Sequence, residues 1–268
     1  MGELLMGSPG GVAVVTGGGR GLGRGIALAL AEAGFDLVLG WVSDQAAIEA
    51  TTALATAAAA TAGQRVVATQ GNVSDASTAM MLLDAAVSLG GPTAWINNAG
   101  VSVLAPVLDT DASDMAHMVE VNVLGTFHGV QAAGRWFRDQ KMPGRIVNLA
   151  SDLGIQAAPN LGGYAATKFA VVGLTQAAAI ELAPAGVTVN AVCPGTAETD
   201  MVLAERTQES ELRAAPLDDV RRSYLDAIPA GRFCTPADVG ALVAFLCSPA
   251  AAYVTGQAIC VNGGSVLH

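Results

Sequence analysis

The segment GYAATK, residues 163–168, places Tyr164 four residues before Lys168 in a chain that contains only three tyrosines and two lysines. Side chains four residues apart lie on the same face of a helix. A cation held close to a phenol favours the phenolate and lowers the phenol pKa from its ordinary value of about 10. A shift of about three units corresponds to about 4 kcal/mol. The pair could therefore exchange a proton near neutral pH, whereas the alternative is a solvated lysine on a helix surface.

A second motif, TGGGRGLG, covers residues 16–23. Gly17, Gly21 and Gly23 follow a β-rich run and precede a helical pattern, with a spacing that differs from the usual GxGxxG fingerprint. Without a Cβ, the backbone can approach a pyrophosphate, and the first amides of the following helix can bind its charge. The motif predicts a dinucleotide site; a glycine-rich turn without a ligand is the alternative.

Short apolar runs alternate with longer segments of helical period, which positions these motifs. The expected strands are 12–16, 37–42, 65–70, 94–97, 144–150, 187–193 and 258–261, and the main expected helices are 22–33, 44–62, 75–89, 111–139, 162–183 and 236–247. This order is typical of an α/β fold, a doubly wound parallel sheet with helices on both faces. No linker divides the chain, so a single domain spanning 1–268 is expected. Ligands of such sheets bind at the carboxyl ends of the strands.

Six ordered motifs resemble the short-chain dehydrogenase/reductase family over essentially the whole chain. They are TGxxxGxG (16–23), NNAG (97–100), NVLGTF (122–127), RIVNLAS (145–151), YxxxK (164–168) and VNAVCPG (189–195), and YVTGQAICVNGG (253–264) agrees as well. The resemblance implies a Rossmann-like fold of about seven strands and an oxidoreductase that interconverts a carbonyl and a secondary alcohol with NAD(P)(H).

The same resemblance implies four catalytic residues. Tyr164 would be the general acid in carbonyl reduction, and Lys168 would lower its pKa and contact the nicotinamide ribose. Ser151, thirteen residues before Tyr164, would hydrogen-bond the substrate oxygen, although a serine there could simply cap a turn. Asn122 would support a proton relay from Lys168 to solvent, or it could be a structural hydrogen-bonding residue inside a helix.

The resemblance also implies a set of cofactor-binding residues along the carboxyl edge of the sheet. Asn72 stands where the family more often has aspartate, so its adenine contact would be altered. The predicted set is Gly17, Gly19, Arg20, Gly21, Leu22, Gly23, Trp41, Ser43, Asn72, Val73, Asn98, Ala99, Gly100, Tyr164, Lys168, Pro194, Gly195, Ala197 and Thr199.

The end of the second expected strand bears on the choice of nicotinamide cofactor. Relatives that prefer NAD usually have an acidic residue there, which binds the ribose hydroxyls and repels a 2′-phosphate. This chain has Trp41 at that place and no carboxylate before Asp44. Arg20 and Ser43 could bind a 2′-phosphate. NADP(H) is therefore favoured, and NAD(H) is the alternative.

The substrate is less well specified by the sequence. In the family, the region corresponding to about 196–230 is a mobile substrate lid, and its polar composition here equally fits two solvated surface helices. A 3-oxoacyl thioester reductase is the first expectation, and sugars, polyols or small ketones are the alternatives. A different kind of function, a non-catalytic dinucleotide sensor or scaffold, is also an alternative. Such proteins usually lack the catalytic tyrosine or lysine, and this chain retains both.

Composition excludes several other classes of protein. A net charge of −10 argues against nucleic acid and anionic membranes as partners. The uncharged stretches are broken by glycine and proline, and the N-terminal MGELLMGSPGG lacks a basic region, so neither a membrane span nor a signal peptide is expected. Cys193, Cys234, Cys247 and Cys260 are expected to be reduced and no metal site is expected. A cytoplasmic location is expected because no membrane span or signal peptide is expected. A homotetramer, or a homodimer, is predicted from the charge-free C-terminal region and the family.

Overall fold

Seven strands form one parallel sheet in the order β3-β2-β1-β4-β5-β6-β7 in a computed structural model that describes residues 11–267. Chain crossovers on both sides of β1 give the doubly wound, Rossmann-like topology that the sequence predicted. The expectation about a signal peptide concerns residues outside the described range. The strands are β1 (Val12–Val15), β2 (Asp36–Trp41), β3 (Val66–Gln70), β4 (Pro92–Asn97), β5 (Arg145–Leu149), β6 (Thr188–Pro194) and β7 (Ala258–Val261).

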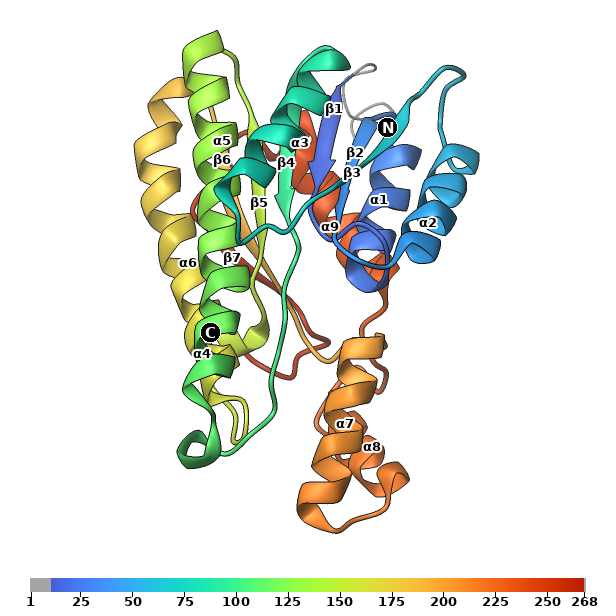
Figure 1. Ribbon diagram of the computed structural model, residues 1–268, viewed down its shortest axis with the longest axis vertical. Coiled ribbons are helices and arrows are strands. Elements are labelled where there is room, and N and C mark those ends of the chain that lie inside the picture. The colour runs from blue at the N-terminus through green and yellow to red at the C-terminus, as the bar shows by residue number, and fades with distance from the viewer. Residues whose placement is uncertain (1–10, 268) are drawn as a thin grey trace.

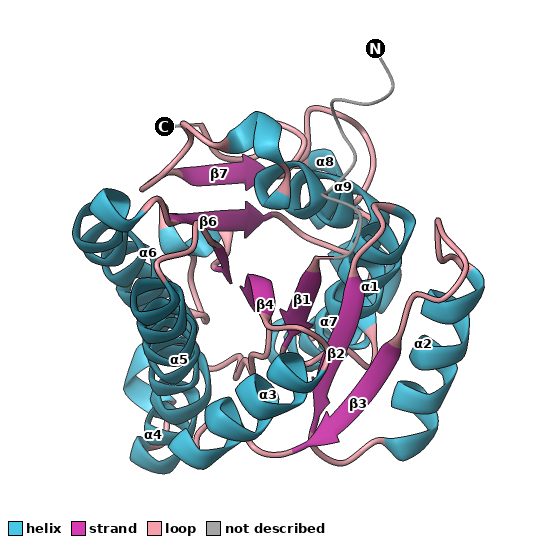
Figure 2. Ribbon diagram, turned by 90° about the horizontal axis from the view of Figure 1, so that it is seen from above, coloured by secondary structure: helices cyan, strands magenta, loops and turns pink. Residues whose placement is uncertain are grey.

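Helices cover both faces of this sheet (Figures 1 and 2). The main helices are α1 (Gly21–Glu32), α2 (Gln45–Ala57), α3 (Ala76–Ser88), α4 (Ala112–Met118), α5 (Gly125–Gln140), α6 (Gly162–Leu182), α7 (Asp200–Arg213), α8 (Leu217–Asp226) and α9 (Pro236–Cys247). In Figure 2, α1, α2 and α9 lie on one side of the sheet, and α3, α5 and α6 lie on the other.

Alternate residues of the central strands point into two separate cores, because successive strand side chains face opposite sides of a sheet. Ala13 and Val15 of β1 pack with Ile26 and Leu30 of α1 in one core. Val12 and Val14 pack in the other core, which contains Trp95, Phe137 and Leu82. Burial on both faces explains why these strands read as continuous apolar runs.

Two predicted helices differ from the observed ones. The helix expected at 111–139 is interrupted by a π-helical segment, Val119–Leu124, between α4 and α5. The helix expected at 44–62 ends at Ala57. There the chain turns onto the end of α1, where Ala60 N and Gln64 Nε2 donate hydrogen bonds to Ala31 O at 3.3 and 3.0 Å. Tertiary contacts therefore override the helix propensity of the alanine-rich run.

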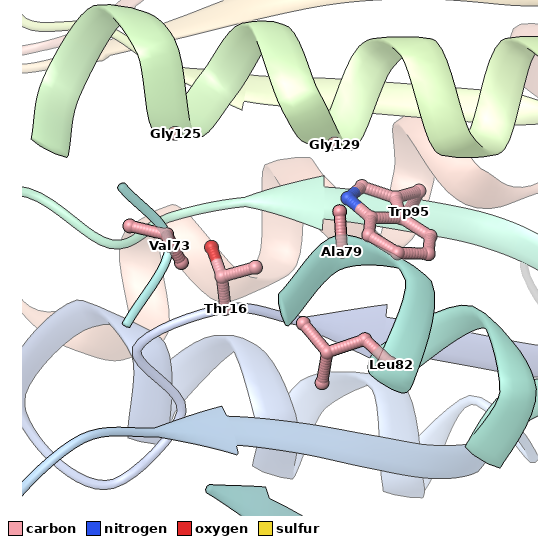
Figure 3. A pocket seen from close by; sticks show the side chains of 7 residues that line it. All are labelled: Thr16, Val73, Ala79, Leu82, Trp95, Gly125 and Gly129. Carbon is pink, nitrogen blue, oxygen red and sulfur yellow. The ribbon is translucent and has the colours of Figure 1, made fainter. Parts of the chain in front are cut away.

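A small internal cavity lies between the sheet, α3 and α5 (Figure 3). Its volume of about 10 Å³ has room for about one water-sized sphere, so it cannot be the substrate site. It is lined by Thr16, Val73, Ala79, Leu82, Trp95, Gly125 and Gly129.

Helices α7 and α8 form a pair that projects from the rest of the molecule (Figure 1). Their two connections to the sheet are joined by backbone hydrogen bonds: Glu198 N donates to Cys234 O at 3.2 Å, and Cys234 N donates to Thr196 O at 3.0 Å. This pair of helices occupies the segment predicted to be the lid. No helix within residues 11–267 is long and apolar enough to cross a membrane.

Candidate active site

Ser151 lies two residues after the end of β5, at the carboxyl edge of the sheet, and is buried. Its Oγ accepts a hydrogen bond from Leu153 N at 3.1 Å and donates to Asp152 Oδ1 at 3.1 Å. The serine therefore caps the short 3-10 turn Asp152–Gly154, and its hydroxyl is near enough to Tyr164 to lower the pKa of the phenol. The turn-capping role considered from the sequence is therefore observed, and the hydrogen bond to a substrate oxygen stays a prediction.

Tyr164 and Lys168 lie in the first turns of α6, as the motif spacing predicted. The Lys168 Nζ atom lies 5.5 Å from the centre of the Tyr164 ring and donates a hydrogen bond to Leu149 O at 2.7 Å. Lys168 is only 4% exposed, so it is not a surface lysine. The small Ala165 between them is buried, which lets this end of α6 pack closely.

The pKa of Tyr164 is raised above its ordinary value, contrary to the expectation from the sequence. Burial of the phenol is the largest cause, and the nearby Glu205 carboxylate adds to it, while the hydrogen bond with Ser151 lowers the pKa. Tyr164 is therefore a neutral phenol near pH 7.

Burial also lowers the pKa of Lys168, to about 8, and the nearby Cys193 raises it. A group with this pKa is still mostly protonated at pH 7. Lys168 thus supplies a buried positive charge and a donor beside the tyrosine.

Asn122 lies inside the π-helical segment and is 1% exposed. Its Oδ1 accepts from Val101 N at 2.8 Å, and its Nδ2 donates to Val101 O at 2.9 Å and Thr167 Oγ1 at 3.0 Å. A Cβ on Gly100 would lie 3.3 Å from Asn122 Oδ1 and 3.6 Å from Lys168 Nζ. The asparagine therefore joins the loop after β4 to the residue preceding Lys168.

The glycine-rich turn has the geometry that a dinucleotide phosphate requires. Gly17 and Gly21 have φ values of +63° and +52°, which disfavour residues with a Cβ. A Cβ on Gly23 would lie 2.1 Å from Gly17 O. Helix α1 begins at Gly21 with no side-chain cap, so its first amides are available to an anion. Gly19 and Leu22 complete this turn, and the residues present fit NAD(P).

Asn98 and Ala99 hold the turn from the other side. Asn98 Nδ2 donates to Thr16 O at 2.8 Å and Gly17 O at 3.1 Å, and the backbone amides of Asn98 and Ala99 both donate to Thr16 Oγ1. The sequence analysis predicts that Asn98 and Ala99 line the cofactor, and in the structure both residues fix the glycine-rich turn to the end of β4.

The predicted adenosine-binding residues lie around the ends of β2 and β3. Trp41 is the last residue of β2 and is partly buried, and Ser43 is exposed. Asn72 and Val73 follow β3; Asn72 Oδ1 accepts from Ser74 N at 3.1 Å. The Arg20 side chain is largely exposed, and its Nη1 lies 4.0 Å from Asp200 Oδ2, at the start of α7.

The predicted nicotinamide-side residues follow β6. Pro194 ends the strand, and a Cβ on Gly195 would lie 2.7 Å from Asn262 Cβ, so the two loops are in close contact. Ala197 is buried. Thr199 is the N-cap of α7, and its methyl would lie 3.4 Å from a Cβ on Gly21. Thr199 thus brings α7 against the glycine-rich turn.

Three residues of this region were not predicted as part of the site. Asp152 is next to Ser151, and Glu205 comes from α7; both carboxylates raise the pKa of Tyr164. Ser102 lies on the loop after β4 and has a buried hydroxyl. Adjacency to Ser151 could have indicated Asp152, whereas nothing in the local sequence distinguishes Glu205 from other charged residues of its helix. Within the described residues, no group of three His, Cys, Asp or Glu side chains could hold a metal ion.

The fold, the glycine-rich turn and the Ser151-Tyr164-Lys168 arrangement define a dinucleotide-dependent oxidoreductase. The profile of a family described as "Enoyl-(Acyl carrier protein) reductase" matches residues 17–266. The chain belongs to the short-chain dehydrogenase/reductase family, as the sequence motifs predicted.

Individual relatives cover nearly the full length of the chain. An L-2,3-butanediol dehydrogenase of Corynebacterium glutamicum is 41% identical over 96% of this chain and 99% of its own. A diacetyl reductase [(S)-acetoin forming] of Staphylococcus epidermidis is 37% identical over 95% of this chain and 98% of its own. The crystal structure of a levodione reductase superposes with a TM-score of 0.88 at 31% identity, covering 96% of this chain and 98% of that one. These relatives are named for reactions of alcohols and ketones.

Proposed function

We propose that this enzyme interconverts a small ketone and a secondary alcohol, with vicinal hydroxyketones and diols as the substrate class. The observation that carries the oxidoreductase function is the meeting of Ser151, Tyr164 and the buried Lys168 at the carboxyl edge of the sheet. The substrate class is supported by the two relatives named for butanediol and diacetyl. It replaces the acyl thioester as the first candidate.

In the proposed reaction, Tyr164 donates a proton to the carbonyl oxygen, and Ser151 hydrogen-bonds the same oxygen and orients it. The Tyr164 phenol carries its proton near neutral pH, which is the protonation state that a general acid needs before it donates. Lys168, held by Leu149 O, would contact the ribose and stabilise negative charge on the phenol. When bound, the nicotinamide supplies or accepts the hydride.

Asn122 is proposed as a positioning residue rather than a proton-transfer group. Its side-chain hydrogen bonds hold Val101 and Thr167, so it fixes the loop after β4 against the α6 turn that carries Lys168. This role follows from the contacts, whereas a proton relay through its backbone carbonyl remains a prediction; Thr126 Oγ1 donates to that carbonyl at 2.7 Å.

The preference for NADP(H) is part of the proposal, with NAD(H) as the alternative. Trp41 occupies the end of β2, where no carboxylate would repel a 2′-phosphate. The Asp44 carboxylate that follows is engaged as the N-cap of α2, accepting from Ala47 N at 3.0 Å. Arg20 lies within the glycine-rich turn, and its largely exposed guanidinium could pair with a 2′-phosphate.

The organisation of the protein is proposed from the same features. One domain would span residues 1–268, with a lid over about 196–230 that includes α7 and α8. A cytoplasmic homotetramer remains the expected assembly. Exposed apolar side chains on the outer helices α5 and α6 support an interface there; they include Phe127, Phe169 and Ile180.

The test compares Tyr164→Phe with Tyr253→Phe, a control at a fully exposed tyrosine. Diacetyl, acetoin and an acetoacetyl thioester are offered with NADPH and with NADH, and cofactor binding is measured by fluorescence. Loss of the proton donor should lower kcat/KM by about 10²–10⁴-fold. Cofactor binding should change little, and the Tyr253 variant should match the wild type.

Undiminished turnover by Tyr164→Phe would contradict the mechanism. Cofactor binding without turnover of any carbonyl by the wild type would favour the sensor or scaffold reading instead. Preference for the thioester over both small ketones would return the acyl substrate to first place.

A further inference from the structure

Glu205 is a partly buried charged residue of α7, the helix that begins against the glycine-rich turn. After burial, its charge is the largest cause that raises the pKa of Tyr164, so the carboxylate lies close to the catalytic phenol. Burial raises the pKa of Glu205 itself, and the nearby Ser102 hydroxyl lowers it. Neither Glu205 nor Ser102 has a part in the mechanism proposed above.

Ser102 approaches the same place from the loop after β4. It follows Val101, whose backbone N–H and C=O are both held by the Asn122 side chain, so its position is fixed by the catalytic machinery. Its Oγ is buried and makes no hydrogen bond of ordinary geometry within the described part of the chain. It is nevertheless near enough to Glu205 to lower the pKa of that carboxyl group. A buried hydroxyl without a partner is costly unless a ligand or water completes it.

The charged groups near Tyr164 that raise its pKa include two carboxylates, so a substrate bound there meets negative charge. Asp152, on the turn after Ser151, and Glu205, on α7, are two carboxylates whose charges both act on the phenol. A substrate that carries its own carboxylate would be repelled here, whereas a substrate hydroxyl could donate to one of them. Ser102 adds a donor beside Glu205.

We propose that Ser102 and Glu205 form a substrate-binding pair that holds the oxygen on the carbon next to the reacting carbonyl. A hydroxyl at that carbon donates to the Glu205 carboxylate and accepts from the Ser102 hydroxyl; a second carbonyl there accepts from Ser102. The pair selects hydroxyketones over simple ketones of the same size. This assignment rests on the proposed function, because it concerns the same reaction and the same site.

The pair joins two parts of the molecule. Ser102 belongs to the sheet edge that carries the catalytic groups, and Glu205 belongs to the helix that Thr199 begins against the glycine-rich turn. A substrate bound between them would contact both the body and the segment expected to be the lid. Recognition of the second oxygen thus depends on the position of α7 seen here.

The test uses two ketones that differ by one hydroxyl, acetoin and 2-butanone. Reduction of each is measured for the full-length wild type, Glu205→Ala, Glu205→Gln and Ser102→Ala. The control Glu211→Gln removes one negative charge from an exposed position of the same helix. Circular dichroism and NADPH binding verify that each variant is folded.

The expected result is a loss of discrimination. Hydrogen bonds to a charged group correspond to about 10- to 100-fold in binding, so the ratio of kcat/KM for acetoin to that for 2-butanone should fall by about this factor in Glu205→Ala. Ser102→Ala should lower the ratio by about 3- to 10-fold. Glu211→Gln should keep the wild-type ratio, and pyruvate, an anionic ketone, should gain activity in Glu205→Gln.

Two results would overturn the assignment, and they are distinguishable. A wild-type ratio retained in both Glu205→Ala and Ser102→Ala, in protein that turns over both ketones, contradicts the pair alone. A wild type that reduces neither ketone but reduces other carbonyls contradicts the proposed substrate class, and the role of the pair with it.

Discussion

Replacing Thr175 with valine removes one hydroxyl from a buried chain of hydrogen bonds beneath the active site. The chain begins at Trp95 Nε1, which donates to Asn97 Oδ1 at 2.9 Å. Asn97 Nδ2 donates to Asn148 Oδ1 at 2.8 Å, and Asn148 Nδ2 donates to Thr175 Oγ1 at 2.9 Å. Thr175 Oγ1 donates in turn to Val171 O at 2.8 Å. The chain connects β4 and β5 to α6, the helix that carries Tyr164 and Lys168.

The magnitude follows from the groups left without partners. Valine has nearly the shape of threonine, so Thr175→Val creates no sizeable cavity, but the Asn148 amide loses its acceptor in a fully buried position. An unsatisfied buried donor costs about 1–3 kcal/mol. We expect the free energy of unfolding to fall by about 2 kcal/mol. In a protein of this size the melting temperature should fall by about 4–8 °C.

Urea unfolding followed by circular dichroism measures this change. The matched control is Thr56→Val on α2, because Thr56 also donates to a carbonyl four residues earlier, at 2.8 Å, but is exposed. That variant should stay within about 0.5 kcal/mol of the wild type. A second variant, Asn148→Ala, and the double variant give the coupling energy, which should exceed about 0.5 kcal/mol.

The reasoning would be refuted if Thr175→Val and Thr56→Val were equally stable. Equal stability would mean that the Asn148 amide finds another partner or water, and that the hydrogen-bond chain does not hold α6 to the sheet. Additive effects of the Asn148 and Thr175 changes would likewise show that the two residues do not act as one network.

Two further predictions concern pH and packing. The pKa of Lys168 is about 8 in the folded chain and about 10.5 when unfolded, so the unfolded state binds more protons between these values and the free energy of unfolding rises with pH across this window. Urea titrations at several pH values should show that Lys168→Met lacks this rise; an identical rise in both proteins would contradict the shift. Gly129→Ala should destabilise by more than about 3 kcal/mol, because its Cβ would lie 1.9 Å from Asn97 Oδ1. A Cβ added to Gly173 would have no atom within 4 Å beyond its chain neighbours and its own helix backbone. Gly173→Ala should therefore stabilise by about 0.5–1 kcal/mol, and equal effects of the two changes would refute the packing argument.

Much of the fold could be predicted from the sequence because buried parallel strands are apolar on both faces. The run 258–261 was expected as a strand and is β7, and its Cys260 lies beside Cys193 of β6 in the sheet register. Helix boundaries were less predictable. The π-helical segment around Asn122 has the composition of an ordinary helix, and it is distinguished by the contacts of Asn122 with Val101 and Thr167, which are distant in sequence.

The segment 200–230 shows why charge alone does not predict exposure. Its composition fits solvated helices, yet Arg206 is 5% exposed and Glu209 is 4% exposed. Arg206 lies 4.1 Å from the centre of the Phe233 ring, and Tyr224 Oη donates to Glu209 Oε2 at 2.5 Å. These partners lie 15 to 27 residues further along the chain, beyond the reach of helical periodicity.

Contacts between residues distant in sequence also determine the pKa of Tyr164. Motif spacing correctly placed Lys168 one turn away, and from that neighbour alone the pKa of the phenol should fall. The structure adds burial and the carboxylates of Glu205 and Asp152, which together raise it. Glu205 is 41 residues from Tyr164 and comes from a different helix, so no local pattern couples them. Since these charges oppose Lys168, the proton affinity of Tyr164 depends on where α7 lies, and a residue that the catalytic motif does not contain contributes to the catalytic pKa.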